Sequence, residues 1–137
     1  MVEYQRSAAR SSGLSGQDIE ELVLKLAKEG RYPSEIGMIL RDQHGVPDVR
    51  QATGKSIAQI LSTRGVGPSL PEDLVGLIRK AVMLHKHLGK NKNDQSSRRS
   101  LGVVEARIQK LAKYYVKNGK LPEGWRYEPE RAALLIR

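Results

Sequence analysis

The sequence contains no cysteine and no phenylalanine, and its aromatic residues make up only 4% of the 137 positions. Without cysteine the chain has neither a disulfide framework nor a thiolate metal site. No apolar run approaches the roughly 18 residues that a membrane span needs, and no secretory signal peptide is recognised at the start. These absences predict a cytoplasmic protein without a membrane partner. The length of 137 residues allows one ordinary domain or two small modules.

Residue patterns typical of catalytic and metal sites are also missing. His85 and His87 are two positions apart and would point to different sides of a helix, while His44 is remote from both. This is not the spacing of a helical metal site, and no glycine-rich phosphate loop of the required spacing occurs. We therefore predict a protein that is not an enzyme and that uses no cofactor, metal or small-molecule substrate.

Acidic residues are scarce in one half of the chain. The whole chain has a net charge of +9, of which residues 1–69 carry +1 and residues 70–137 carry +8. Within residues 79–120 there are 12 Lys and Arg residues but only two acids, Asp94 and Glu105. Such concentrated positive charge is typical of a nucleic-acid binder, whereas a merely solvated surface usually intersperses acids among the bases.

The first half of the sequence has a polar start followed by three short apolar periodicities. Residues 1–14 are polar and aperiodic, which predicts a flexible N-terminal arm. Residues 15–65 predict a small three-helix module, because apolar residues at helical spacing alternate with capping and turn residues. The predicted helices are 17–29, one beginning at Pro33, and one headed by Thr53 and Ser56, with a single turn capped by Asp48 before the last.

A compact unit of short helices is also compatible with a helix-turn-helix DNA-binding regulator that uses residues 15–65. A reading helix requires Arg, Lys, Asn or Gln clustered on its exposed face near its start. The third predicted helix offers only Lys55 and Gln59, and the module is nearly neutral. We therefore favour a packing or protein-contact role for this module and keep DNA binding as the alternative.

The second half predicts two long helices joined by a polar turn. Residues 66–70 read as a linker, and the acids just after Pro71 favour the start of a helix over 71–88, which Gly89 can end. A second helix is predicted over about 96–117. Because the turn is short, the two should pack as an antiparallel hairpin. The fold class is therefore all-α, and residues 71–137 are a basic hairpin domain with a C-terminal tail.

The second long helix has two contrasting faces. Its basic face carries Arg107, Lys110 and Lys117, with Tyr114 among them, on roughly the opposite side from an apolar stripe. One face can pack while the other meets an anion. The stripe consists of Leu101, Val104, Ile108, Leu111 and Tyr115.

The turn itself mixes basic groups with short polar side chains. His87 precedes it, and Asp94 and Ser97 lie among lysines and arginines. A carboxylate beside a phosphate backbone is repulsive unless it accepts a hydrogen bond from a base amino group. This favours the reading of base edges, although Asp94 or Ser97 serves equally well as a cap of the following helix. Both interpretations stay open at this point.

Several stretches together resemble a known family. The pattern HLxxNKxDxxSRR, a following helix that ends KYY, and the tail GKLPEGWRYEPE are similar to the small-subunit ribosomal protein S15 family, in its archaeal and eukaryotic branch, called S13 in eukaryotes. LVLKLAKEGRYPSEIGMILRDQHGVPDV and LPEDLVGLIRKAV resemble the same branch. The resemblance covers residues 19–137, nearly the whole chain.

This resemblance implies a four-helix RNA-binding core and a structural role in the small ribosomal subunit, of the 30S/40S type. It implies binding of small-subunit rRNA at a three-way junction and in the minor groove of an adjoining helix, which aids assembly of the central domain. Neighbouring ribosomal proteins are the other expected partners. The minor-groove residues fall on His87, Asp94 and Ser97, and the junction residues on Tyr114 and its basic neighbours. The expected RNA-binding residues are His87, Asp94, Ser97, Arg98, Arg99, Arg107, Lys110, Lys113, Tyr114 and Lys117.

The C-terminal tail carries Trp125 and Tyr127 between prolines and glycines. We interpret these two aromatic residues as anchors packed on the fold rather than as a stacking platform. Residues 129–137 predict a short terminal helix. A protein-interaction adaptor is a further alternative function, and it would tolerate neutralisation of the lysines in residues 79–120.

Overall fold

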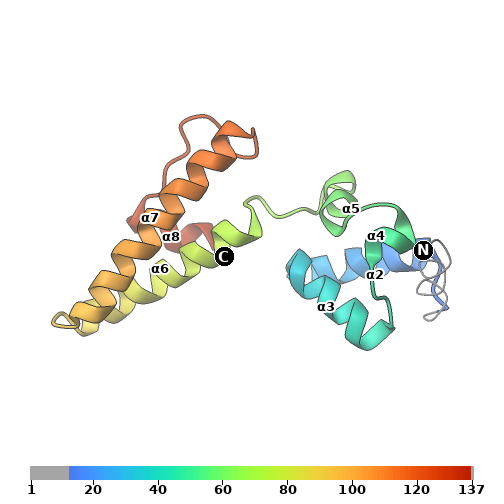
Figure 1. Cartoon of the computed structure of the whole chain (residues 1–137), viewed down its shortest axis with the longest axis horizontal. Coiled ribbons are helices and arrows are strands. Elements are labelled where there is room, and N and C mark those ends of the chain that lie inside the picture. Colours follow the sequence, from blue (N-terminus) through green and yellow to red (C-terminus); the bar gives the residue numbers. More distant parts are fainter. Residues whose placement is uncertain (1–12, 137) are drawn as a thin grey trace, which may run out of the picture. The chain divides into compact units, whose positions relative to one another are not determined.

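The computed structural model describes residues 13–136, which contain seven helices and no strand (Figure 1). The prediction of an all-α protein is confirmed. The predicted N-terminal arm lies almost wholly outside the described residues. The chain divides between Pro68 and Ser69 into two compact units, each of which is described separately.

Within residues 13–68, the described part of the first unit, there are four helices, and residues at their ends explain where they begin and stop. Ser15 caps the first of them by accepting a hydrogen bond from the Asp18 backbone, while the Asp18 carboxylate accepts from the Ser15 N–H at 2.9 Å. Gly45 ends the second in a left-handed conformation with φ of 65°. The helices are α2 (Gly16–Lys28), α3 (Pro33–His44), α4 (Val49–Thr53) and α5 (Ile57–Thr63).

One detail of the predicted module is wrong. Thr53 was expected to head the third predicted helix, but it is the last residue of α4, which Asp48 caps. Its hydroxyl donates to the Val49 carbonyl at 2.8 Å, a bond within the preceding turn. Ser56 therefore caps α5 without Thr53, in a reciprocal pair with Gln59.

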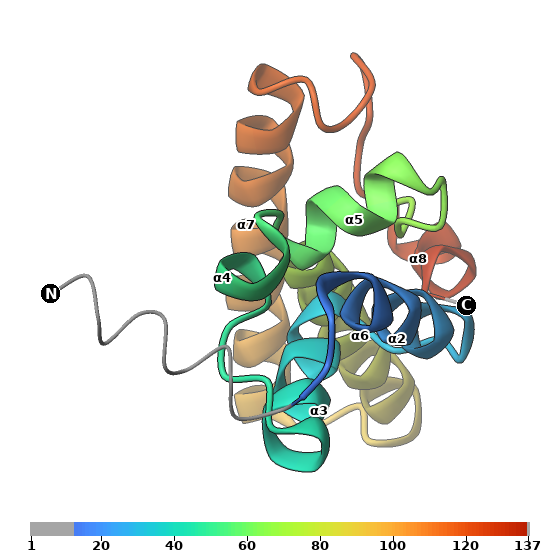
Figure 2. The same ribbon diagram turned by 90° about the vertical axis from the view of Figure 1, so that its right-hand side faces the viewer.

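The core of the first unit lies where α2 packs against α3, α4 and α5, and Figure 2 shows these helices from a second direction. Apolar residues of all three predicted helices form this core, because each helix turns one apolar stripe toward its neighbours. The buried residues are Ile19, Val23, Ile36, Leu40, Val46, Val49, Ile60 and Leu61.

The second unit is a helical hairpin with a short third helix against it. α6 (Glu72–Lys90) and α7 (Gln95–Lys117) run antiparallel, as predicted, and α8 (Pro129–Leu135) packs on α6 (Figure 1). Gly89 does not end α6, because the Asn91 N–H still bonds to the His87 carbonyl and continues the helical pattern through Lys90.

The hairpin core combines both predicted stripes with small residues. Leu101, Val104, Ile108 and Tyr115 are buried as predicted, but Leu111 is only half-buried and Ala112 is buried in addition. The buried stripe of α7 is thus rotated from the predicted one toward the side on which the C-terminal tail lies. The residues buried in this unit are Leu70, Leu74, Val75, Ile78, Ala81, Leu101, Val104, Ile108, Ala112, Tyr115, Leu121 and Ala132.

A tyrosine links the last turns of α7 to the first turn of α6. The Tyr115 hydroxyl donates to the Asp73 carboxylate, and its ring is buried. Burial, followed by the hydrogen bond and the charge of Asp73, raises the pKa of Tyr115 to about 12. The folded state therefore holds this proton more tightly than the unfolded chain does.

This linkage predicts a loss of stability at high pH. The stabilisation is complete below pH 10, where an unfolded tyrosine keeps its proton, and is lost as pH rises toward 12. We expect Tyr115→Phe to reduce the free energy of unfolding by about 1 kcal/mol at neutral pH. The variant should also flatten the decline above pH 10, measured by denaturant unfolding across the pH range. Tyr114→Phe, at a residue 57% exposed, is the matched control and should change both values much less, because the charge of Tyr114 is the smallest of the causes that raise the pKa of Tyr115.

Candidate nucleic-acid interface

The turn between α6 and α7 spans residues 91–94 and is held by side chains on both of its sides. Asp94 is the N-cap of α7, and its Oδ1 accepts from the Ser97 N–H at 3.0 Å. The Arg98 Nη2 donates to the Lys92 carbonyl at 2.7 Å. Arg98, predicted as an RNA contact, thus also braces the turn, which keeps the end of the hairpin short and rigid.

The three predicted minor-groove residues form one cluster at this turn. Nε2 of His87 lies 2.8 Å from Oδ2 of Asp94, and the Ser97 hydroxyl donates to the same oxygen at 2.7 Å. The backbone and hydroxyl of Ser97, and then His87, hold the pKa of Asp94 well below its usual range. Asp94 therefore caps α7 with one oxygen and joins His87 to Ser97 with the other.

The hydrogen bonds within this cluster leave part of its accepting capacity unused. A carboxylate has no proton to give, so the contact between His87 and Asp94 places a hydrogen on His87 Nε2. In the neutral imidazole Nδ1 is then an acceptor, and the Asn91 amide nitrogen lies 3.4 Å from it. The Ser97 oxygen, having donated to Asp94, keeps its lone pairs. The cluster can thus accept a hydrogen bond from a ligand at the Ser97 oxygen, and at His87 Nδ1 where a ligand donor replaces the Asn91 amide.

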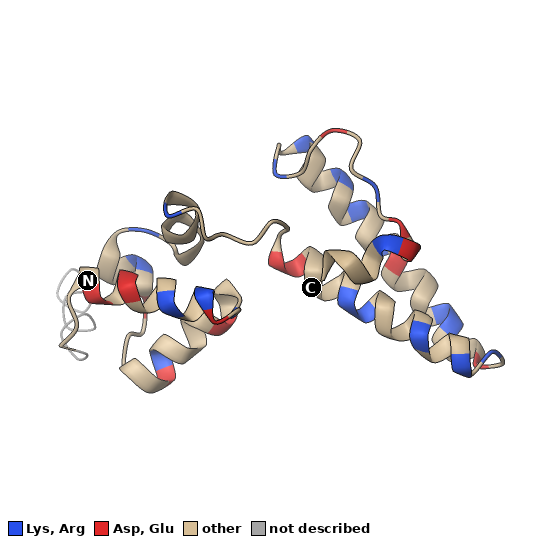
Figure 3. Cartoon of the chain, turned by 180° about the vertical axis from the view of Figure 1, so that it is seen from behind, with Lys and Arg blue, Asp and Glu red and all other residues tan. Residues whose placement is uncertain are grey.

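The basic face predicted for α7 is exposed. Tyr114 is 57% exposed and meets the buried Tyr115 ring edge to face at 5.3 Å, so the core residue supports the surface one. Lys and Arg positions recur along both helices of the hairpin (Figure 3). We use the name basic face for six exposed residues of α7, five of them basic and one a tyrosine: Arg99, Arg107, Lys110, Lys113, Tyr114 and Lys117.

Two groups of residues were missed by sequence reasoning. Lys80, Lys86 and Lys90 add exposed charge on α6, and the charge count of residues 79–120 was the signal that included them. Asn91, beside His87, is a fixed position of the pattern HLxxNKxDxxSRR but was given no role. Its contact with the His87 imidazole depends on the conformation of the turn, which the sequence pattern does not specify.

Both acids of residues 79–120 are engaged by histidines. Asp94 lies against His87, and Oε1 of Glu105 lies 2.8 Å from Nε2 of His85 on the facing helix. These pairs direct the negative groups toward neighbouring side chains rather than toward the basic face. The surface of α7 is therefore dominated by positive charge, which favours an anionic ligand.

The first unit offers no comparable surface on its third predicted helix. Lys55 lies 3.7 Å from one carboxylate oxygen of Glu20, and Arg64 lies 3.8 Å from the other. Both basic groups near the ends of α5 are thus paired with α2. This arrangement does not favour the helix-turn-helix alternative, in which α5 would present unpaired donors to base edges.

Within residues 13–136, no helix is long and apolar enough to cross a membrane. The same residues hold no group of three or more His, Asp or Glu side chains arranged to bind a metal ion.

Comparison with known proteins adds a decisive observation. Residues 57–135, more than half of the chain, match the family described as ribosomal protein S15. The chain belongs to the ribosomal protein S15 family. Residues 1–46 match the ribosomal S13/S15 N-terminal domain. The family resemblance inferred from the sequence motifs is therefore confirmed.

Curated S15 relatives span archaea and eukaryotes and match almost end to end. The small ribosomal subunit protein uS15 of Methanobrevibacter smithii is 51% identical over 90% of this chain and 93% of its own length. The proteins of the same name from Methanoculleus marisnigri and Brugia pahangi are 42% and 46% identical, each over 97% of this chain and 88% of the relative. The predicted archaeal and eukaryotic branch of the S15 family is confirmed by these matches.

Proposed function

We propose that this chain is a structural constituent of the small ribosomal subunit, without catalysis, that binds small-subunit rRNA through the α6–α7 hairpin. The end of the hairpin lies in the minor groove of an RNA helix, and the basic face of α7 contacts phosphates at an adjoining three-way junction. The cluster of His87, Asp94 and Ser97 is the observation that carries this proposal. Membership of the S15 family and the names of the relatives support it.

The chemistry of the cluster suits the minor groove of RNA. This groove is wide and shallow in an A-form helix and exposes 2′-hydroxyl groups, while the major groove is too narrow for side chains. The guanine amino group is the base-edge donor available there. A short turn that carries acceptors can approach both kinds of donor, and Asp94, Ser97 and His87 are all short enough to do so without long flexible stems.

The basic face supplies a second, less specific contribution. Lys and Arg side chains that neutralise phosphates release counterions, so this part of the affinity falls as salt concentration rises. Tyr114 lies among them and offers an exposed aromatic ring for contact with unpaired bases or sugars at the junction. We assign phosphate contacts to Arg99, Arg107, Lys110, Lys113 and Lys117, with Arg98 contributing from the turn.

The two halves of the chain have different tasks in this proposal. Residues 71–137 form the rRNA-binding domain, and residues 15–65 form a nearly neutral module suited to neighbouring ribosomal proteins. Residues 66–70 join them. The RNA contacts made by residues 71–137 bring the chain to the central domain of the subunit early in its assembly.

The proposal is tested by titrating the full chain against three nucleic acids of equal length at two salt concentrations. These are a small-subunit RNA three-way junction with its adjoining helix, a scrambled RNA and a DNA duplex. We expect preference for the junction RNA, and that preference should survive the higher salt because the minor-groove contacts do not depend on counterion release. Equal, salt-sensitive binding to all three would refute junction recognition. Preference for the DNA duplex would revive the helix-turn-helix alternative.

A further inference from the structure

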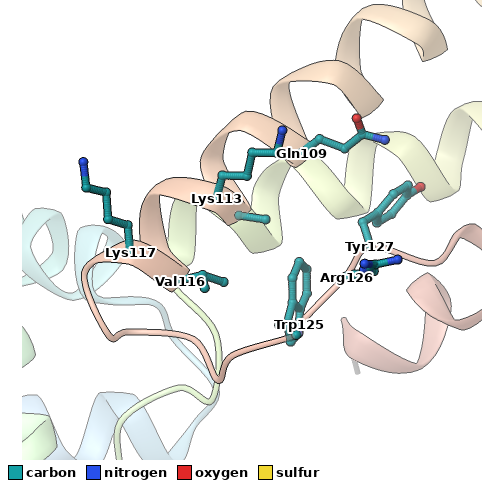
Figure 4. A pocket seen from close by; sticks show the side chains of 9 residues that line it. Gln109, Lys113, Val116, Lys117, Trp125, Arg126 and Tyr127 are labelled. Atoms are coloured by element: carbon teal, nitrogen blue, oxygen red, sulfur yellow. The ribbon is translucent and has the colours of Figure 1, made fainter.

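A pocket of about 540 Å³ lies between the last turns of α7 and residues 121–127, which we call the tail segment. Its volume is within the roughly 300–1,000 Å³ of typical ligand pockets. On the helix side the pocket is lined by Ala112 and Val116, and on the tail side by Trp125 and Tyr127. Figure 4 shows the Trp125 ring rising from the tail segment toward α7. Each side of the pocket therefore contributes apolar or aromatic surface, and Gln109 adds a polar side chain from α7.

The backbone and a buried neighbour fix the aromatic wall. Gly124 turns the chain in a left-handed conformation, φ 82°, and the Trp125 N–H donates to the Pro122 carbonyl at 3.2 Å. The Tyr127 hydroxyl oxygen is buried, and burial together with the nearby Glu105 carboxylate raises the pKa of Tyr127. Tyr127 thus anchors the tail segment, while Trp125 is only half-buried and keeps ring surface toward the pocket.

The rim of the pocket is cationic. Lys113, Lys117 and Arg126 all line it and are all exposed, and no carboxylate is among the lining residues. Lys113 and Lys117 also belong to the basic face. The pocket therefore opens beside the surface that we propose for phosphate contact, and an RNA strand on that surface would pass its rim.

We propose that the pocket receives one unpaired nucleobase of the bound rRNA. The base stacks on the Trp125 indole, and the phosphate of the same nucleotide lies among Lys113, Lys117 and Arg126. This inference rests on the proposed function and adds a second contact site to it. It also gives Trp125 a stacking role beyond the anchoring role that the sequence favoured.

A nucleotide fits the pocket better than a peptide does. A nucleobase is a flat ring system attached to an anionic backbone, and the pocket combines a flat aromatic wall with a rim whose charged residues are all cationic. Stacking on an aromatic side chain beside a positive groove is the usual way in which proteins hold unpaired bases. An acidic peptide would satisfy the rim but would leave the indole face without a planar partner.

The single tryptophan of the chain allows a direct test, because its emission reports on this pocket alone. The full chain is titrated with the three-way junction RNA, which has unpaired nucleotides, and with a fully paired RNA duplex of equal length. Anisotropy of labelled RNA measures binding, and tryptophan emission measures occupancy of the pocket. We expect emission to fall to a plateau in step with junction binding and to change little with the duplex, in which every base is paired.

Variants sharpen the test. Trp125→Leu should weaken junction binding by about 5- to 150-fold, the usual range for loss of one stacked base, and Trp125→Phe should restore most of it. Arg126→Gln should weaken binding. Arg131→Gln is the control, because it removes the same charge from a residue of α8 that is paired with Glu128, and it should not weaken binding. Thermal unfolding of each variant checks that the tail segment stays folded.

The outcomes separate this inference from the proposed function. If the junction RNA binds with preference but emission is unchanged and Trp125→Leu binds as tightly as the native chain, the nucleobase pocket is overturned and the proposed function stands. The pocket would then suit a contact with a neighbouring protein. If the junction RNA is not preferred at all, the proposed function fails and the nucleobase pocket fails with it.

Discussion

Asp94→Ala is expected to weaken binding to the junction RNA by between about 5- and 150-fold, the range for a lost base-reading contact. The substitution removes the acceptor itself and also the group that holds His87 and Ser97 in place. Binding to an unrelated RNA duplex should barely change, because the basic face is left intact. Dissociation constants for both RNAs, measured at one salt concentration, give the comparison.

Two controls distinguish base reading from general effects. Lys110→Ala should weaken binding to every RNA by a similar factor and lower the salt slope by about one, as loss of one phosphate contact requires. Asp94→Asn retains an oxygen that can cap α7, so its thermal stability separates the cap from the RNA contact. An equal loss for all RNAs with Asp94→Ala would rule out base reading by this cluster.

Ile108→Ala is expected to reduce the free energy of unfolding of the hairpin unit by about 3 kcal/mol, within the 2–5 kcal/mol range for such core truncations. Ile108 is fully buried at the centre of the α7 stripe, so its loss removes apolar contacts and leaves a cavity. Denaturant unfolding monitored by tryptophan emission measures the effect, because Trp125 lies in the same unit. RNA binding should weaken only when the hairpin is partly unfolded.

Val103→Ala is the matched control on the same helix. Val103 is 48% exposed, so its truncation removes little buried surface. It should change the free energy of unfolding by well under about 1 kcal/mol, as most surface substitutions do. If Ile108→Ala proved no more destabilising than Val103→Ala, Ile108 would not be a core residue of the hairpin.

Most of the secondary structure was predictable because its signals are local. Asp48 and Ser56 cap helices in the structure as the sequence predicted, and Ser15 caps α2 in the same way, since a side-chain oxygen needs only a backbone N–H two or three residues away. Periodicity identified the buried faces for the same reason. The errors in helix boundaries fall at Thr53 and Gly89. Thr53 was expected to begin a helix and Gly89 to end one, but a hydrogen bond to the preceding turn keeps each of them in the helix that comes before.

The candidate site was predictable to a lesser degree. The basic face of α7 follows from helical spacing and charge, and its residues are exposed. Residues close to Asp94 in the sequence could not decide whether it caps α7 or reads a base edge. Only the antiparallel return of the chain brings His87, seven positions earlier, against Asp94, so that one carboxylate both caps α7 and joins His87 to Ser97, the arrangement that we propose for base reading.

The sequence by itself determined the all-helical class, the helices, the apolar stripes and the concentration of positive charge, because these depend on residues close together in the chain. Tertiary structure alone decided which groups meet across the hairpin. The pairing of His85 with Glu105, the bond from Tyr115 to Asp73 and the pocket between Trp125 and α7 all join residues distant in sequence. Their positions follow from how the apolar stripes of α6, α7 and α8 pack together, and no local pattern encodes that packing.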